Sequence, residues 1–304
     1  MGRRASRTER LLLIAHISDF HIVPPPALCY GYSDTRAGLM HAVAALNGLA
    51  PRPDLVLASG DLVDEPSVEA YATLRAILAK LAIPLVLLPG NHDDRMLLTE
   101  AFPEHDYLPQ GGAPAHFARD LGAVRLVAFD AVIPGKEYAE PTAEGLDWLA
   151  ATLAAAPAQP TMLVLHHPPI ATGLAFMDAI QPPWPLRLAA ILDANPQVRL
   201  VGCGHVHRLI DGMLGHARVA SAGSTGHQFA FATDLESPPR LSGEPAMIRL
   251  HLWRDGAVTS FATPVARDFT THAFEGIDES GWKRIRAQLL GGGTRPGGAT
   301  IEGA

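Results

Sequence analysis

The chain has 304 residues, 48% of them hydrophobic, enough to bury the core of one large domain or of a domain with an appendage. Its formal net charge of -7 argues against a general nucleic-acid binder, because such proteins usually carry a basic face. The two cysteines, Cys29 and Cys203, occur in no CxxC or zinc-ligand spacing, so we expect no disulfide framework and a reducing compartment, the cytoplasm.

The first apolar run, Leu11–Ile17, follows an arginine-rich segment and could imitate a secretory signal. The run is short, however, and leads into Ser18-Asp19-Phe20-His21 rather than into a small-residue cleavage site. We therefore interpret 1–10 as a disordered basic tail and Leu11–Ile17 as a buried first strand, with His16 as a core histidine whose hydrogen bonds are satisfied. No run of 18 apolar residues follows, so no membrane span or membrane partner is expected.

Apolar runs of strand length then alternate with longer helical patterns. Strands are expected at 54–58, 84–88, 124–129, 162–165 and 198–201, and helices at about 35–49, 67–81, 142–155 and 185–194. This alternation predicts βαβ units and a largely parallel sheet covered by helices.

The pattern changes after residue 218. Segments 246–253 and 257–263 flank Asp255-Gly256, a hairpin signal, so a more antiparallel set of strands is expected to complete the sheets. The glycine-rich segment from residue 291 is expected to be disordered. These features divide the chain into the tail (1–10), one main domain (11–263) and a partly disordered C-terminal extension (264–304).

Polar clusters follow five of the six strand-like runs. They are Asp19 and His21; Gly60-Asp61 with Asp64; Gly90-Asn91-His92-Asp93; His166-His167; and Gly204-His205-Val206-His207. Because the carboxyl ends of parallel strands share one edge of an open α/β sheet, where ligands bind, these clusters are expected to meet.

Each cluster alone also has an ordinary explanation. Gly-Asp at a strand end is more often a turn than a ligand, and Gly-Asn-His-Asp can be a turn followed by a helix cap. Histidines gathered at strand ends are costlier to leave without a partner. Since five clusters in this order are very improbable as independent turns, the sequence favours a shared site.

Spacing within the clusters is consistent with a shared site. Asp19 and His21 are two residues apart, as are His205 and His207, which on an extended strand places both side chains on the same side. A local change of backbone direction would let the second pair serve two adjacent metals. The glycine before three of the clusters would permit a sharp turn and a close backbone approach.

The ordered motifs from Asp19-Phe20-His21 to Gly204-His205-Val206-His207 resemble the calcineurin-like metallophosphoesterases over about residues 11–263. Tyr30-Gly31-Tyr32 and His166-His167-Pro168-Pro169, with Met177-Asp178 downstream, are similar to the bacterial glycerophosphodiesterase and class III cyclic-nucleotide phosphodiesterase branch. The resemblance implies an α/β fold, a four-layered α/β/β/α sandwich with two mixed sheets, whose catalytic domain is 11–263.

The resemblance also implies two divalent metal ions. One would be held by Asp19, His21, Asp61 and His207, and the other by Asp61, Asn91, His166 and His205. Imidazole and carboxylate ligands together suit Fe, Mn, Zn or Co better than Mg or Ca.

Other polar residues near the motifs are expected outside this ligand set. His92, beside Asn91, is the candidate for stabilising the transition state or protonating the leaving oxygen. Asp64 and His167 are expected to orient ligands from a second layer. His227, on a late loop, is a candidate for facing the pocket, and the loops at 24–36, 170–185 and 223–234 are the candidates for contacting substrate.

The implied activity is that of a phosphodiesterase that cleaves small diesters, such as 3′,5′-cyclic nucleotides (cAMP) or glycerophosphodiesters, with a metal-activated hydroxide. A phosphomonoesterase or a nuclease on the same scaffold is the alternative, and the acidic balance disfavours the nuclease. A non-enzymatic binding module would have lost ligands, and none is missing here. In relatives the C-terminal end helps form dimers or larger assemblies, but the stretch from about residue 264 does not match that branch. The resemblance therefore leaves the oligomeric state open, with a homodimer or larger homo-oligomer as the candidate assembly, and no nucleic-acid partner is expected.

Overall fold

The computed structural model describes residues 11–180, 182–236, 238–265 and 278–290. It divides into two compact units, Met1–Ala266 and Arg267–Ala304, and the second contains helix α7 (Glu279–Leu290). The tail expected at 1–10, residues 266–277 and the segment from 291 onward lie outside the described residues. Among the described helices, none has the length and apolar character needed to cross a membrane. The following paragraphs concern the first unit.

One sheet has five strands in the spatial order β13 (Ala257–Pro264), β12 (Met247–Arg254), β1 (Leu11–Ile17), β2 (Leu55–Ala58) and β3 (Leu85–Leu87). Strands β1, β2 and β3 are parallel, and β12 and β13 form the antiparallel hairpin predicted around Asp255-Gly256. The sequence analysis did not predict that β12 pairs with β1, a pairing that places the first strand at the centre of its sheet.

The other large sheet has six strands in the order β4 (Phe117–Asp120), β5 (Arg125–Ala128), β6 (Thr161–Val164), β7 (Val198–Cys203), β9 (Ala217–Ser221) and β8 (Asp211–Leu214). The four central strands are parallel, and both edge strands are antiparallel to their neighbours. A small ribbon pairs β10 (Gln228–Phe229) with β11 (Leu241–Ser242).

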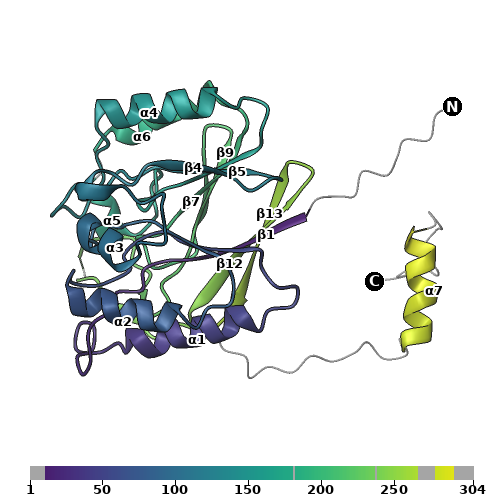
Figure 1. Cartoon of the computed structure of the whole chain (residues 1–304), viewed down its shortest axis with the longest axis horizontal. Coiled ribbons are helices and arrows are strands. Elements are labelled where there is room, and N and C mark those ends of the chain that lie inside the picture. The colour runs from purple at the N-terminus through teal and green to yellow at the C-terminus, as the bar shows by residue number, and fades with distance from the viewer. Residues whose placement is uncertain (1–10, 181, 237, 266–277, 291–304) are drawn as a thin grey trace. The chain divides into compact units, whose positions relative to one another are not determined.

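Helices cover the outer face of each sheet (Figure 1). Helices α1 (Thr35–Asn47) and α2 (Val68–Leu78) lie on the five-stranded side, and α4 (Ala143–Ala154) and α6 (Trp184–Asp193) on the six-stranded side. All four lie within a turn of their predicted bounds. The sequence analysis did not anticipate α3 (Arg95–Ala101), the short α5 (Ala175–Asp178) or the 3-10 turn η1 (Gln110–Gly112).

Three buried cores hold the four layers together. One lies between the two sheets and includes Leu57, Met162 and Trp253, while the others join each sheet to its own helices. Strands buried on both faces read as continuous apolar runs, which is why Leu11–Ile17 shows no alternation. The layers confirm the predicted α/β/β/α sandwich.

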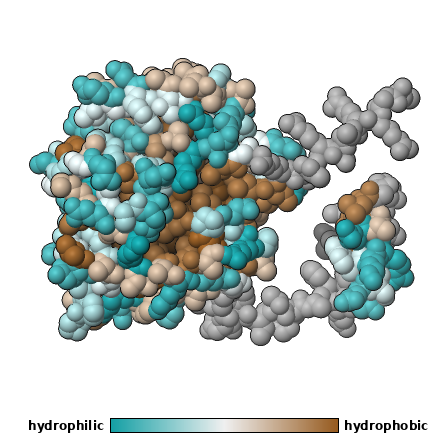
Figure 2. Space-filling view, in the orientation of Figure 1, coloured by the Kyte–Doolittle hydropathy of each residue, from teal (hydrophilic) through white to brown (hydrophobic). Residues whose placement is uncertain are grey.

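The two ends of the strands differ in character. Figure 2 shows apolar residues gathered on the surface over β1 and β13. Leu11, at the start of β1, is 49% exposed. Leu11 begins β1, whereas Asp19 follows its carboxyl end. The polar clusters therefore occupy the opposite end of the strand.

Candidate metal centre

The turns that follow β1 and β2 run beside each other and place their side chains in one space. The Asp19 amide donates to the Gly60 carbonyl and the His21 amide to the Asp61 carbonyl, both at 3.0 Å. The turn after β3 approaches just as closely, because a Cβ on Gly90 would overlap the backbone and carboxylate of Asp61. Glycine is the residue that permits such an approach.

The backbone at these turns is in the left-handed region. Asp19, His21, Asp61, His205 and His207 have φ angles of 54°, 44°, 51°, 69° and 51°. The described chain contains only two further non-glycine residues with positive φ, Tyr30 and Asp255. The expectation that each Asp-x-His or His-x-His pair lies on an extended strand is therefore wrong. The strands end before the pairs, and the left-handed turns redirect successive side chains.

Four histidine rings in the cluster have their Nδ1 atom committed to an oxygen that only accepts. His166 and His207 donate to the carbonyls of Ser59 and His227, at 2.8 and 3.1 Å. His21 donates to the Asp64 carboxylate at 3.1 Å, and His92 to the Asp64 carbonyl at 2.7 Å. In a neutral ring this leaves Nε2 with an open lone pair, as metal-ligating histidines require.

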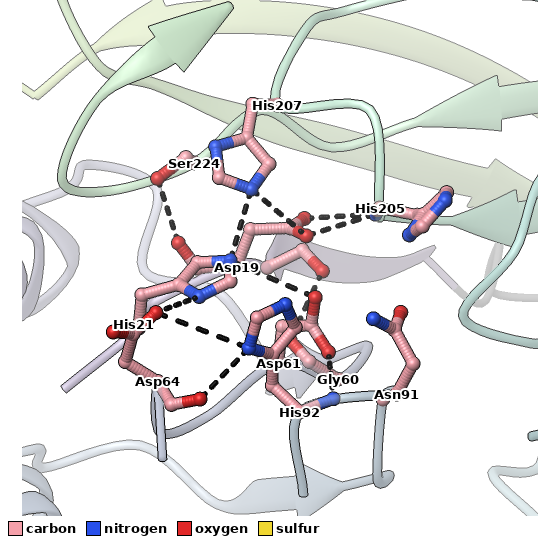
Figure 3. Close-up of polar contacts among 12 residues, drawn as sticks. Asp19, His21, Gly60, Asp61, Asp64, Asn91, His92, His205, His207 and Ser224 are labelled. Atoms are coloured by element: carbon pink, nitrogen blue, oxygen red, sulfur yellow. Dashed lines mark hydrogen bonds and ion pairs between the residues drawn. The ribbon is translucent and has the colours of Figure 1, made fainter. Parts of the chain in front are cut away.

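The first group of ligand atoms comprises Asp19, His21 and His207 (Figure 3). The Nε2 atoms of His21 and His207 face each other at 2.9 Å. An Asp19 carboxylate oxygen lies 3.6 Å from the His207 Nε2 atom, and an Asp61 oxygen lies 3.6 Å from the His21 Nε2 atom. Lone pairs and carboxylate oxygens that converge in this way fit a cation among them.

The second group comprises Asp61, His166 and His205. The His166 Nε2 atom lies 3.2 Å from an Asp61 carboxylate oxygen and 3.1 Å from the Asn91 side-chain oxygen. The Asp61 carboxylate therefore borders both groups, and a carboxylate has two oxygens to share between two cations. The described residues fit a pair of divalent ions, although the donor set does not identify the element.

A third, overlapping group joins His92 to His21 and Asp61. The His92 ring packs edge-on against His21, with ring centroids 4.6 Å apart, and its side chain is 24% exposed. His92 thus reaches the cluster from the side of the cavity, whereas the other rings lie beneath it.

The charges of the cluster are strongly coupled. Burial lowers the pKa of His166, but the neighbouring Asp61 carboxylate outweighs burial and raises that pKa to about 9. Burial raises the pKa of Asp19 to about 6. For Asp61, burial favours a higher pKa, yet His166 holds it well below the usual range. Buried carboxylates and imidazoles thus compete for protons here, and bound cations would relieve that competition.

A cavity of about 310 Å³ opens above the cluster. His21, Asp61, Asn91 and His92 lie at its polar side together with His205 and His207. Its remaining wall is mainly aromatic and apolar: Tyr30, Tyr138, Phe176, Met177, Ile180 and Phe229, with Glu137 among them. The sequence analysis had singled out the loops at 24–36, 170–185 and 223–234 as candidate substrate contacts, and five of these seven residues lie in them.

Glu137 and Tyr138 are the cavity residues that the sequence analysis missed. They lie on the loop between β5 and α4, which contains no recognisable motif. Asp93 was seen in its motif but given no role. Its carboxylate accepts hydrogen bonds from the Leu62 amide at 3.0 Å and the Gly90 amide at 2.8 Å, so it ties the two turns together.

Two further histidines from the sequence analysis are buried beside the cluster. The His167 Nε2 atom donates to the Glu137 carbonyl, 3.2 Å away, because a carbonyl oxygen only accepts. Its Nδ1 atom, and both ring nitrogens of His227, are buried without a hydrogen-bond partner among the described residues. The His227 ring packs on Tyr30 and His207, with centroid distances of 5.5 and 4.9 Å.

Comparison with known proteins gives a consistent result. A family model described as calcineurin-like phosphoesterase matches residues 12–209. The glycerophosphodiester phosphodiesterase GpdQ of Enterobacter lignolyticus (strain SCF1) is 36% identical over 230 residues, covering 75% of this chain and 82% of the relative. The 3',5'-cyclic adenosine monophosphate phosphodiesterase CpdA of Pseudomonas aeruginosa is 31% identical over 244 residues, covering 80% of this chain and 87% of the relative.

Among solved structures, the purple acid phosphatase PPD1 from yellow lupin (Lupinus luteus) seeds has a similar fold. The TM-score is 0.58 at 14% identity, with 87% of this chain and 57% of that chain covered. At this identity the similarity concerns the fold alone.

Proposed function

Because this chain belongs to the calcineurin-like phosphoesterase family, we propose that it hydrolyses small phosphodiesters with two divalent metal ions held by the clusters that share Asp61. The observation that carries the proposal is the position of Asp61, whose carboxylate borders both groups of ligand atoms at the base of the cavity. A single-metal site would need no shared carboxylate.

The ligand assignment keeps the two sets named from the sequence. Asp19, His21, Asp61 and His207 would hold one ion, and Asp61, Asn91, His166 and His205 the other. When bound, two such ions supply a water molecule of lowered pKa and charge compensation for the phosphoryl oxygens. The protein's part is to keep the Nε2 atoms free of protons, which the carbonyls of Ser59 and His227 and the Asp64 carboxylate do by accepting from Nδ1.

His92 is the proposed catalytic residue. Its Nδ1 atom is fixed on the Asp64 carbonyl, so the Nε2 atom is the one directed to substrate. In the protonated ring, Nε2 would donate its proton to the alcohol oxygen as the ester bond breaks, or hydrogen-bond to the phosphoryl oxygens. His227 is buried and is not among the residues that line the cavity, so it would act on the site through the Tyr30 and His207 rings that pack on it.

The substrate classes proposed are glycerophosphodiesters and 3′,5′-cyclic nucleotides, which the names of the relatives indicate for those proteins. The aromatic wall of the cavity offers apolar contact to the alcohol or nucleoside part of either. Both cysteines are free and buried, which is consistent with a reducing cytoplasm. Self-association as a homodimer or larger assembly stays a prediction.

The test is a rate panel on the purified protein loaded with manganese or zinc. Bis(p-nitrophenyl) phosphate should be cleaved faster than p-nitrophenyl phosphate, which has the same leaving group; cAMP and glycerophosphoethanolamine should also be cleaved, and a chelator should abolish all turnover. Asp61→Asn is the matched control, since it replaces one carboxylate oxygen with nitrogen and keeps the size of the side chain. Equal or faster cleavage of the monoester would contradict the proposal.

A further inference from the structure

Glu137 lies at the mouth of the cavity, against the proposed second metal site. One of its carboxylate oxygens accepts a hydrogen bond from the Asn91 side-chain nitrogen at 2.9 Å. The same oxygen lies 3.9 Å from the His92 Nε2 atom, the atom directed to substrate. The Glu137 side chain is 78% exposed, so its carboxylate is in contact with solvent as well as with Asn91. A negative charge therefore stands where a phosphate group enters.

The loop that carries Glu137 is fixed at its base. Asp130 forms a two-point ion pair with Arg95, at 2.7 and 2.9 Å, and Arg95 also donates to the Val132 carbonyl at 2.8 Å. Arg95 begins α3 directly after the turn that carries Asn91 and His92. The pair therefore ties the loop to the turn whose side chains Glu137 contacts.

Backbone contacts also constrain the tip of the loop. Val132 and Ala139 form an antiparallel bridge, and a turn with Gly135 at φ 72° reverses the chain between them. The Glu137 carbonyl accepts from His167, a buried ring beside the metal cluster, at 3.2 Å. Glu137 is thus held by its backbone as well as by its contact with Asn91.

Apart from histidine, the described residues of the cavity wall include no basic side chain to offset this carboxylate. Among the described residues that line the cavity, none is lysine or arginine, and the acidic members are Asp61 and Glu137. Sites that bind a doubly charged phosphate usually supply arginine or lysine to it. Here the positive charge proposed to face the phosphoryl group comes from the metal ions and from histidine.

We propose that Glu137 selects phosphate esters by charge, admitting the singly charged diester and disfavouring the doubly charged monoester. The inference rests on the proposed function. A phosphodiester carries one negative charge, while a monoester carries nearly two above its second pKa of about 6. The extra charge of a monoester meets the Glu137 carboxylate, so the same residue promotes release of the monoester product.

The size of the effect of Glu137 on affinity depends on how strongly solvent screens its charge. Glu137 is mostly exposed, so its repulsion of one additional charge is much weaker than in a dry interior. We expect roughly a three- to tenfold effect on relative affinity at low salt, shrinking as ionic strength rises.

The test compares Glu137→Gln with the parent protein and with Glu140→Gln. Glutamine keeps an oxygen that accepts from Asn91 but removes the charge. Glu140 is an exposed acid on the same loop that does not line the cavity, so its replacement changes net charge equally. Affinities of methyl phosphate and dimethyl phosphate are measured by calorimetry at pH 8 on protein saturated with manganese, with metal content checked.

Glu137→Gln should strengthen methyl phosphate binding roughly three- to tenfold relative to dimethyl phosphate, whereas Glu140→Gln should leave the ratio unchanged. An unchanged ratio in Glu137→Gln, or an equal change in both variants, overturns the proposal. A ratio change that disappears at saturating metal also overturns it, because the effect would then lie in metal occupancy. These binding measurements need no turnover, so they stand apart from any failure of the rate panel.

Discussion

Both carboxylate oxygens of Asp19 accept a hydrogen bond from the backbone amide of His205, at 2.9 and 3.0 Å, across 186 residues of sequence. The side chain at the end of β1 therefore holds the turn after β7, which carries His205 and His207. Asp19 serves the centre twice, as a proposed ligand and as the cap of the turn that presents two others.

This double role predicts different outcomes for two replacements of Asp19. Asp19→Asn keeps an acceptor for the His205 amide, whereas Asp19→Ala leaves that amide unpaired. Both should lose metal, but only alanine should expose the His205 amide to hydrogen exchange and lower the free energy of unfolding of the metal-free protein by about 1–3 kcal/mol relative to asparagine. Equal exchange rates in the two variants would show that Asp19 does not hold the turn.

Metal stoichiometry should separate the bridging ligand from a terminal one. The parent protein should contain about two ions per chain. Asn91→Ala should lose about one of them and recover rate when metal is added in excess, because only the second group uses Asn91. Asp61→Asn should weaken both groups and should not recover. Elemental analysis across a metal titration measures this, and an active enzyme without metal would refute the assignment.

Replacing His92 by alanine should separate chemistry from metal binding. Metal content should stay the same while the rate falls roughly 10²–10⁴-fold, the usual contribution of an acid–base group. The loss should be smaller for a nitrophenolate leaving group, which hardly needs a proton. His41→Ala, at an exposed position of α1, is the control. A loss of equal size on good and poor leaving groups would indicate that His92 stabilises the phosphoryl oxygens instead.

Stability should fall as the pH is lowered because of a buried histidine pair, His16 on β1 and His251 on β12. The His16 Nδ1 and His251 Nε2 atoms lie 3.3 Å apart, and the outer nitrogens bond to Ser59 and Ser260, both at 2.8 Å. Burial lowers the pKa of His16 from 6.5 to about 3, and burial together with His16 lowers that of His251 well below 6.5. The partners satisfy His16, in agreement with the sequence analysis.

The direction of this change of stability with pH follows from whether the folded or the unfolded chain binds more protons. Below pH 6.5 the unfolded chain takes up protons at both rings and the folded chain does not, so the free energy of unfolding falls from pH 6.5 toward about 3. Each ring contributes up to about 1.4 kcal/mol per pH unit. In metal-free protein, denaturant titrations at a series of pH values should show the free energy of unfolding falling less steeply with falling pH for His251→Gln than for the parent. Identical slopes would mean that the pair is already charged in the folded state.

The sequence predicted the strands and helices that have a clear apolar pattern and the site residues that belong to a motif. Leu11–Ile17 is the observed first strand, because a short continuous apolar run is typical of a strand buried on both faces. Asp255-Gly256 lies at the turn of the predicted hairpin. The turn geometry was not predictable in the same way. Asp19 and His21 look like alternate residues of a strand, and only tertiary contacts with the Gly60 and Asp61 carbonyls impose their left-handed backbone.

Glu137 illustrates the other limit. Its neighbours in sequence form an irregular loop. Its place at the site is apparent only from its hydrogen bond with Asn91, 46 residues away. Pairing of this kind depends on where the Arg95–Asp130 ion pair anchors the loop, and no local pattern encodes that contact. Residues that act by position alone are found only when the fold is known.

The left-handed backbone at five centre residues has a consequence for directed evolution. In metal-free protein, glycine at His205, whose side chain makes no hydrogen bond among the described residues, would relieve about 1–3 kcal/mol of conformational strain while adding about 0.4–1 kcal/mol of freedom to the unfolded chain. The replacements that best survive heating would thus include ones that cannot bind metal. A campaign that selects this enzyme for heat resistance alone would erode its active site, so turnover has to be selected in every round.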